Sequence, residues 1–298
     1  MKKCLLGTLV LSIGFFLTAC GNDEEHTNTE LPDVTSSNTT SDERNTEESQ
    51  NENEDIEESI QEDENELLNV DLKDRSSMSE EEWVAAYEAK EKLIDFEIEE
   101  VAYAWNEIET GGLGKYSYYA LVTNTGKVTI DIFPHTVSFY NKDGSVAAVS
   151  EGALSVSPNT LNAGEKSLIR MYTSDHDADV DNFDYAELNL GILLSHYDST
   201  KLNIESPTYN TDPTLKATAS IVNGTDIDAV AITSAFVFYN DNGDFIGGLT
   251  AGLENKLQAG SKKEIEADYP PFPKEQYDNI ANMEAWSYFV DYGDDWME

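Results

Sequence analysis

Residues 138–144 read SFYNKDG, and residues 237–243 read VFYNDNG. Both stretches place a Phe-Tyr pair before an Asn and end on a Gly at the same spacing. Asp-Gly and Asn-Gly between strand-like runs are typical of tight β-hairpin turns, which need positive φ. Each stretch therefore predicts a strand followed by a hairpin turn, in which Phe and Tyr alternate between core and surface.

The similarity extends to both sides of these stretches. Residues 122–124 (VTN) correspond to residues 221–223 (IVN), and residues 161–166 (LNAGEK) correspond to residues 257–262 (LQAGSK). The offset stays at roughly 100 residues, which is the length of a small domain and not of a solenoid unit. We infer that one domain has been duplicated, with the first copy within residues 76–198 and the second within residues 199–298.

The pattern inside each copy is that of β-strands. Val128, Ile130 and Ile132 alternate with polar neighbours in the first copy, as Ala229 and Ala231 do in the second. Pro134 predicts an edge position or a bulge. Short strands separated by Gly and Asn predict an antiparallel sandwich, and neither copy alternates strands with long helices as a parallel α/β fold would. The expected class is therefore mainly β.

The second copy also resembles a known family. Residues 236–240 read FVFYN, close to the Phe-x-Leu-Tyr-Asp signature of the FxLYD domain. The upstream Val-Asn pair and the downstream Ala-Gly-x-Lys are similar to that group and to the related telokin-like bacterial domains. The first copy departs from the signature at Val137 and Asn141. The resemblance covers roughly residues 96–298 and implies tandem immunoglobulin-like antiparallel β-sandwiches. Such domains are common on bacterial surface lipoproteins, mostly without an assigned activity.

The N-terminus has the pattern of a secretory signal peptide. A positive start at Lys2 and Lys3 precedes an apolar run over residues 5–17, and residues 17–20 read LTAC. This ending resembles the lipobox of bacterial lipoproteins. The resemblance implies that residues 1–19 are removed and that Cys20 is the lipid attachment site, carrying acyl chains such as palmitate. An ordinary cleaved signal or a membrane span is the alternative, although the run is shorter than the roughly 20 residues that a span needs.

The expected location is thus the extracytoplasmic face of a bacterial cell membrane, of the Gram-positive type, with membrane contact through the lipid. The sequence has two cysteines, Cys4 and Cys20. The first would leave with the signal peptide and the second would carry lipid, so no thiol would remain for a disulfide, for thiol catalysis or for a Cys-ligated zinc.

Residues 20–75 are rich in acidic and small polar residues, as in residues 51–55 (NENED) and 62–64 (EDE). Such a composition cannot bury enough apolar surface to fold, which predicts a disordered acidic tether. The whole chain has a formal net charge of −41. We therefore expect it to bind neither nucleic acid nor anionic lipid surfaces. The acidic segment could serve only as a tether, or it could bind a basic partner.

The first ordered element should be a short helix. Ser77 and Glu80 fit a capping box, and Trp83 and Tyr87 lie one turn apart. We predict a helix over residues 78–93 that packs through Trp83 onto the domain that follows. An amphipathic helix that meets a partner is the alternative.

Tyr116, Tyr118 and Tyr119 form an aromatic cluster on another predicted strand. Two interpretations of the cluster remain open. It can belong to the sandwich core, or part of it can be exposed and stack on a glycan or a protein partner.

An acidic ladder places Asp175, Asp177, Asp179 and Asp181 at alternate positions. Calcium takes six to eight oxygen ligands, and closely spaced Asp residues can supply several of them. The ladder is not an EF-hand, because Val180 stands where that loop requires Gly. The second copy reads DYPPFP over residues 268–273, so the fold itself does not need the ladder. The alternative is a solvated acidic loop, and a melting temperature that ignores millimolar calcium would exclude the calcium site.

No catalytic motif is present. The four histidines are scattered, and the sequence contains no Gly-x-Ser-x-Gly elbow, His-Glu-x-x-His pair or phosphate-binding glycine loop. We expect no enzymatic activity, no cofactor and no metal site beyond the calcium alternative. The expected function is a lipid-anchored cell-surface interaction module that binds a protein or another envelope component. The alternatives are a structural or protective envelope lipoprotein and a ligand- or calcium-responsive sensor.

Overall fold

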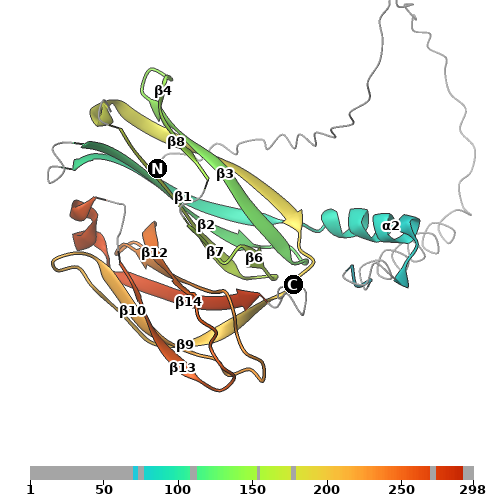
Figure 1. Ribbon diagram of the computed structural model, residues 1–298. Helices are drawn as coiled ribbons and strands as arrows, with labels where there is room; N and C mark the ends of the chain where they lie inside the picture. Colours follow the sequence, from blue (N-terminus) through green and yellow to red (C-terminus); the bar gives the residue numbers. More distant parts are fainter. Residues whose placement is uncertain are drawn as a thin grey trace, which may run out of the picture. The chain divides into compact units, whose positions relative to one another are not determined.

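The computed structural model describes residues 70–72, 77–107, 113–152, 155–175, 179–268 and 273–290 (Figure 1). These residues belong to one compact unit, Asn51–Glu298. The predicted signal peptide, the lipid site at Cys20 and most of the predicted tether lie outside the described residues. Within the described ranges, no helix combines the length and the apolar character that crossing a bilayer requires.

The helix forms two residues later than predicted. Helix α2 spans Glu80–Glu91, and its N-cap is Ser79, not Ser77. The capping box is formed with Glu82, whose carboxylate accepts a hydrogen bond from the Ser79 amide at 2.9 Å. This register puts three glutamates in the first turn, where the helix dipole favours negative charge. The same hydrogen bonds lower the pKa of the exposed Glu82 carboxyl.

Helix α2 packs onto its own chain through the predicted face. Trp83 stacks on Tyr87, with ring centroids 5.2 Å apart, and lies 6.3 Å from the ring of His196. The indole of Trp83 donates to the Leu72 carbonyl at 3.3 Å. Ala86 of the helix is fully buried in a small cluster with Leu72. The helix is therefore attached to the first sandwich, as predicted.

The first sandwich has two antiparallel sheets (Figure 1). One has the order β1-β2-β7-β5, and in the other β3 pairs with β4, β6 and β8. A short 3-10 helix, η3 (Val180–Asn182), precedes β8. The strands are β1 (Phe96–Glu107), β2 (Leu113–Asn124), β3 (Ile130–Asn141), β4 (Val146–Glu151), β5 (Ser155–Ser157), β6 (Thr160–Leu161), β7 (Lys166–Asp175) and β8 (Phe183–Leu194).

The second sandwich repeats this plan with the strand order β12-β11-β14-β9-β10-β13. Strand β9 joins its two sheets, because the start of β9 pairs with β14 and the remainder pairs with β10. The 3-10 helix η4 (Lys274–Asn279) precedes the last strand. The strands are β9 (Ser199–Asn210), β10 (Lys216–Val222), β11 (Ile232–Tyr239), β12 (Phe245–Leu253), β13 (Lys262–Ala267) and β14 (Asn282–Val290).

Strand pairing confirms the predicted fold class. In the first sandwich β1 pairs with β2, β2 with β7, and β3 with both β4 and β8. In the second, β9 pairs with β10, β10 with β13, and β11 with both β12 and β14. The chain is thus mainly β, with tandem immunoglobulin-like antiparallel sandwiches preceded by a short helix. The register of β3 against β8 shifts between Pro134 and Thr136, which is the predicted bulge.

The repeated Phe-Tyr pairs lie as the alternation predicts. Phe139 and Phe238 are fully buried in the two cores, whereas Tyr140 and Tyr239 are half-buried on the opposite faces of their strands. Gly144 closes the first hairpin with φ +81°, and its counterpart in the second sandwich has φ +82°. Both glycines occupy the left-handed region, which explains why Gly ends both repeated stretches.

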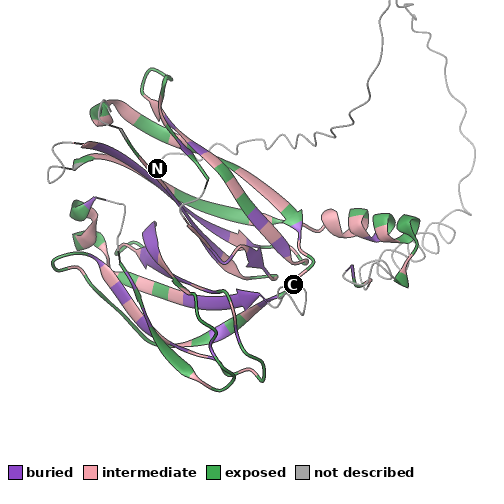
Figure 2. Cartoon of the chain, viewed as in Figure 1, coloured by how far each residue is buried: buried purple, intermediate pink, exposed green. Residues whose placement is uncertain are grey.

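Strand β2 is buried on both faces, since residues 114–122 are all buried (Figure 2). Tyr116 and Tyr118 point into the core of the first sandwich. Tyr119 and Leu121 point the other way and join the core cluster of the second sandwich. The core interpretation of the tyrosine cluster is thus confirmed, and the exposed interpretation is wrong. Tyr119 is buried because a second domain covers the outer face of its sheet.

The covering face belongs to β11, β12 and β14. A Cβ built on Gly248 of β12 would lie 2.7 Å from Cδ2 of Leu168 on β7, so the two sheets meet closely at this glycine. The Trp286 indole donates to the Ser157 carbonyl at 3.1 Å, and the Tyr103 hydroxyl donates to the Ile246 carbonyl at 2.9 Å. Burial raises the pKa of Tyr103 to about 12. The two sandwiches therefore share one continuous apolar cluster.

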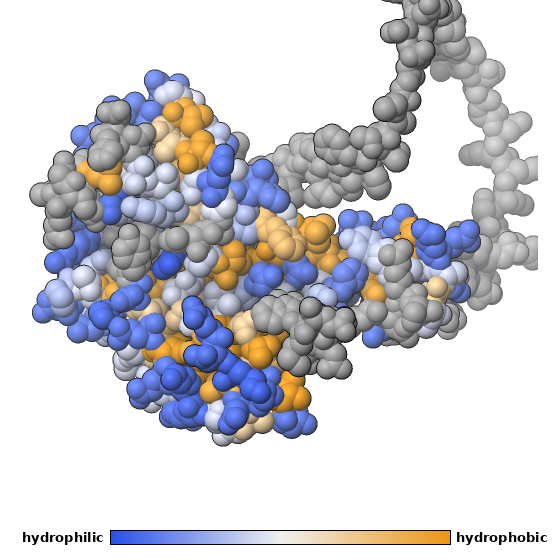
Figure 3. All heavy atoms as spheres, in the orientation of Figure 1, coloured by the Kyte–Doolittle hydropathy of each residue, from blue (hydrophilic) through white to orange (hydrophobic). Residues whose placement is uncertain are grey.

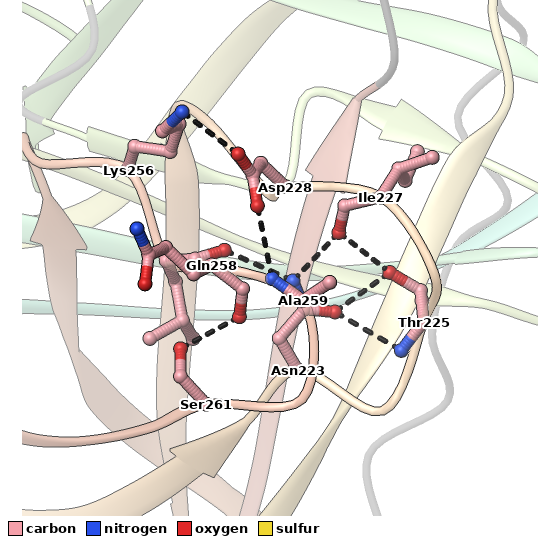
Figure 4. A network of polar contacts seen from close by, with 9 residues as sticks. Asn223, Thr225, Ile227, Asp228, Lys256, Gln258, Ala259 and Ser261 are labelled. Carbon is pink, nitrogen blue, oxygen red and sulfur yellow. Dashed lines mark hydrogen bonds and ion pairs between the residues drawn. The ribbon is translucent and has the colours of Figure 1, made fainter.

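Each sandwich also contains one fully buried asparagine at the end of its second strand. Figure 4 shows the second of them, Asn223, whose amide donates to the carbonyls of Ile227 and Leu257, both at 2.9 Å. Its side-chain oxygen accepts from the amide of Thr225 at 3.1 Å. In the first sandwich Asn124 bonds in the same way.

The backbone of each asparagine completes the arrangement. The backbone N–H of Asn223 donates to the Ser261 carbonyl at 2.9 Å, and the backbone N–H of Gly260 donates to the backbone carbonyl of Asn223 at 2.8 Å. The Asn124 backbone bonds in the same way to Glu165 and Gly164. The repeated Val-Asn and Ala-Gly-x-Lys stretches are therefore bound to each other in both sandwiches.

We predict that Asn124→Ala and Asn223→Ala each lower the free energy of unfolding by about 1–3 kcal/mol, because each substitution leaves buried carbonyls without a hydrogen-bond donor. Chemical denaturation of the full chain measures the loss. Asn203→Ala, at an exposed position of β9, is the matched control. A loss no greater than that of the control would contradict the structural role of the buried amides.

Candidate interaction surface

Exposed apolar side chains gather on one sheet of the first sandwich. Nine large hydrophobic residues of the described ranges are exposed, and five of them come from β3, β4 and β8. Two are more than half exposed, Val146 at 55% and Leu193 at 52%. Figure 3 shows hydrophobic residues on the surface that β4 forms. We call this surface the apolar face, defined by Phe133, Val146, Val149, Tyr185 and Leu193.

Strand register places these residues on the outer side of the sheet. Val149 lies opposite Ser138, and Leu193 lies opposite Asp131. Phe133 lies opposite Gly191, where a Cβ would be 2.9 Å from the His135 ring, so this pair leaves no room for a larger side chain. The alternate positions of β3 are occupied by buried core residues. The apolar face therefore points away from the core.

An aromatic stack closes one end of the apolar face. The rings of Tyr140 and Tyr185 are parallel within 14°, with centroids 4.8 Å apart. Partial burial, together with the charges of Glu187 and Asp184, raises the pKa of Tyr185. The phenol thus stays neutral near neutral pH, and the stack offers a flat aromatic surface with one polar tip.

Carboxylates lie between the apolar side chains. Asp131, Glu151 and Glu187 stand on the outer positions of β3, β4 and β8. None of the outer positions of these three strands carries Lys or Arg. Exposed apolar side chains interspersed with carboxylates, without Lys or Arg, are the composition of a recognition surface and not of a catalytic cleft.

The described ranges provide little for a small ligand. A concavity of about 340 Å³ lies between α2 and the first sandwich. Its lining is polar and mixes Lys90, Lys127 and His196 with Asp71 and Asp198. Within the part of the chain that the structure describes, no group of three or more His, Cys, Asp or Glu residues could hold a metal ion.

The acidic ladder falls largely outside the described residues. Residues 176–178 and the side chain of Asp175 are not described, so the calcium prediction is not tested. Asp179 and Asp181 are exposed beside η3, and the Asp181 carbonyl accepts from Lys142 at 2.8 Å. Cys20 also lies outside the described residues.

Sequence reasoning missed the apolar face. The available signal was the apolar character of strands that should alternate, in residues 146–149 (VAAV) and 190–194 (LGILL). A strand with apolar residues on both sides is expected to be covered on both sides. In β2 both sides are covered, whereas in β4 and β8 the outer side is exposed.

No family model matches the chain, and no curated protein matches it. Among solved structures, β-glucuronidase 2 of Bacteroides uniformis bound to cyclophellitol-6-carboxylate aziridine matches with 13% identity and a TM-score of 0.18. That match covers 58% of this chain and 24% of that one. The C-terminal globular domain of an oligosaccharyltransferase from Pyrococcus abyssi matches with 12% identity and a TM-score of 0.17, over 66% of this chain and 47% of that one. Likenesses this weak carry no functional argument.

If the apolar face is exposed to solvent and is not covered by another part of the chain, acidic substitutions there should have little effect on stability. Val149→Asp should change the free energy of unfolding by about 0.5 kcal/mol or less, as is usual for surface positions. Leu193→Asp should cost about 0.2–1 kcal/mol more, because the new carboxylate would lie opposite Asp131. Phe139 follows Ser138, the partner of Val149, and points into the core, so Phe139→Ala should lower the free energy of unfolding by about 3–5 kcal/mol. Denaturation in urea compares the three variants, and a large loss in the Asp variants would show that the face is covered in cis.

Proposed function

We propose that this protein is a lipid-anchored interaction module on the extracytoplasmic face of a bacterial cell membrane, without enzymatic activity. The observation that carries the proposal is the exposed apolar face on β3, β4 and β8. Several exposed apolar side chains gathered on one sheet of a domain mark a protein–protein contact more often than they serve the fold. The partner would be a protein or another component of the cell envelope.

The membrane attachment rests on the sequence. The lipobox-like residues 17–20 support acylation of Cys20. Each buried CH₂ of an acyl chain contributes about 0.8 kcal/mol, so two or more chains anchor stably. The acidic segment before residue 70 would then hold the sandwiches away from the anionic membrane surface. Residues 70–72, which the sequence assigns to the tether, instead pack against α2.

Two other functions have less support. A structural or protective envelope lipoprotein needs no exposed apolar face, because it would act through its location in the envelope and not by binding a partner. A ligand-responsive sensor would need an apolar cleft with a few converging polar groups, whereas the lining of the concavity between α2 and the first sandwich is mainly polar and carries charges of both signs. A calcium-responsive sensor would depend on Asp175 and Asp177, of whose side chains the structure gives no description.

We expect Cys20→Ser to release the protein from the membrane fraction, because the chain then lacks the sulfur that carries lipid. Cell fractionation and labelling with a radioactive or clickable palmitate measure the change. Crosslinking in intact cells, followed by pull-down and mass spectrometry, should enrich an envelope partner with the native chain and lose it with the variant. A Cys20→Ser protein that stays in the membrane fraction would contradict lipid anchoring.

A further inference from the structure

The second sandwich shows how the counterpart of the apolar face is used. The pairing of β11 with β12 and β14 matches that of β3 with β4 and β8. By this register Tyr239 corresponds to Tyr140, and Glu284 corresponds to Glu187. In the second sandwich this face is not exposed, because it packs against the first sandwich.

The surface that covers the counterpart is the outer face of the sheet formed by β1, β2 and β7. Its apolar centre includes Leu168, which faces Gly248. Beside this centre, Nζ of Lys166 lies 3.0 Å from Oε2 of Glu284, and the same carboxylate oxygen accepts from the Tyr239 hydroxyl at 3.1 Å. The contact therefore combines aliphatic packing with a lysine bound to a Tyr–Glu pair.

The apolar face has a Tyr and a Glu at the same two positions, with Tyr140 stacked on Tyr185, but a different residue at the centre. Tyr140 and Glu187 remain on the outer side of β3 and β8. Val149 of β4 stands where the second sandwich has Gly248. A Cβ at Gly248 would lie 2.5 Å from the Phe236 carbonyl of its own sheet and 2.7 Å from Cδ2 of Leu168. Because Val149 adds a side chain at the point where Leu168 approaches Gly248, a surface that covers Val149 must leave more room there than Leu168 does. The face is thus suited to a similar but not identical sheet.

A second copy of this chain is a poor occupant. The counterpart of the covering sheet in the second sandwich is formed by β9, β10 and β13. There Thr218 and Ser220 replace Tyr119 and Leu121 of β2. Its charged residues are already paired at the surface, as in Lys216–Glu266 at 2.9 Å and Lys262–Glu205 at 2.6 Å.

Charge repulsion also argues against any other part of this chain as the occupant of the apolar face. The acidic segment over residues 20–75 would be repelled by the carboxylates of the apolar face. The same repulsion opposes face-to-face pairing of two copies, each with a formal net charge of −41.

We infer that the apolar face binds the face of a β-sheet of a different protein, with small aliphatic residues at its centre and a Lys or Arg opposite Glu187. This inference rests on the proposed interaction function and names the class of partner. The basic residue would take the place that Lys166 has against Glu284. The small aliphatic residues would lie over Val149, and the Tyr140–Tyr185 stack would border the contact.

The test places a photo-crosslinking residue, p-benzoylphenylalanine, at position 149 or 193 of the full lipidated chain in the cells that produce it. The control carries the same residue at position 264, which is exposed on β13. Melting temperatures and circular dichroism verify that each variant folds. We expect one adduct from positions 149 and 193 and none from position 264, with the crosslinked peptide lying on a strand that carries Lys or Arg.

Charge reversal provides the second measurement. Glu187→Lys should lower the adduct yield about tenfold, whereas Glu264→Lys, with the same change in net charge, should leave it unchanged. Reversing the partner's basic residue to Glu should restore the yield with Glu187→Lys. An adduct on an acidic or helical segment, or one that ignores Glu187→Lys, would overturn the inference.

Failure of the inference and failure of the proposed function give different results. If whole-chain crosslinking enriches a partner but positions 149 and 193 give no adduct, the apolar face is not the contact, and the interaction function stands. If neither experiment enriches a partner, both proposals fall.

Discussion

Each sandwich depends on one buried amide. Asn124 and Asn223 satisfy carbonyls that leave the strand ladder, and they do so with both the side chain and the backbone. A buried carbonyl without a donor is costly, so the loop after β2 and the turn before β7 must stay together, as must the loop after β10 and the turn before β13. This constraint explains why two short stretches, far apart in the sequence, recur as a matched set in both copies.

The packing of the two sandwiches follows from a different constraint. Strand β2 is buried on both sides, and its outer side needs a covering surface from outside its own sandwich. The second sandwich does so through β11, β12 and β14, with Gly248 allowing the close approach to Leu168. Because this contact uses the outer face of the first sheet, the opposite sheet of the first sandwich is left with the apolar face exposed.

Much of the fold could be predicted from the sequence, because its signals are local. The hairpin glycines, the bulge at Pro134 and the alternation of Phe139 with Tyr140 follow from short-range geometry. The helix start was predicted at Ser77 and lies at Ser79, because two serines have a Glu three residues later and only the second brings three glutamates into the first turn. The apolar face could not be predicted, since whether β4 and β8 are covered depends on contacts between domains.

Gly248 and Val149 occupy equivalent positions in the two copies, but the sheet around Gly248 is covered and the sheet around Val149 is exposed. The two ends of the tandem are therefore not equivalent. In stacked repeat proteins, the outer face of a terminal unit is polar so that stacking stops there. The charged face of β10 and β13, with the Lys216–Glu266 and Lys262–Glu205 pairs, has this character. The face around Val149 does not. The tandem is therefore a stack of two units that is capped on one side and open on the other, and a third sheet could extend it only from the first sandwich.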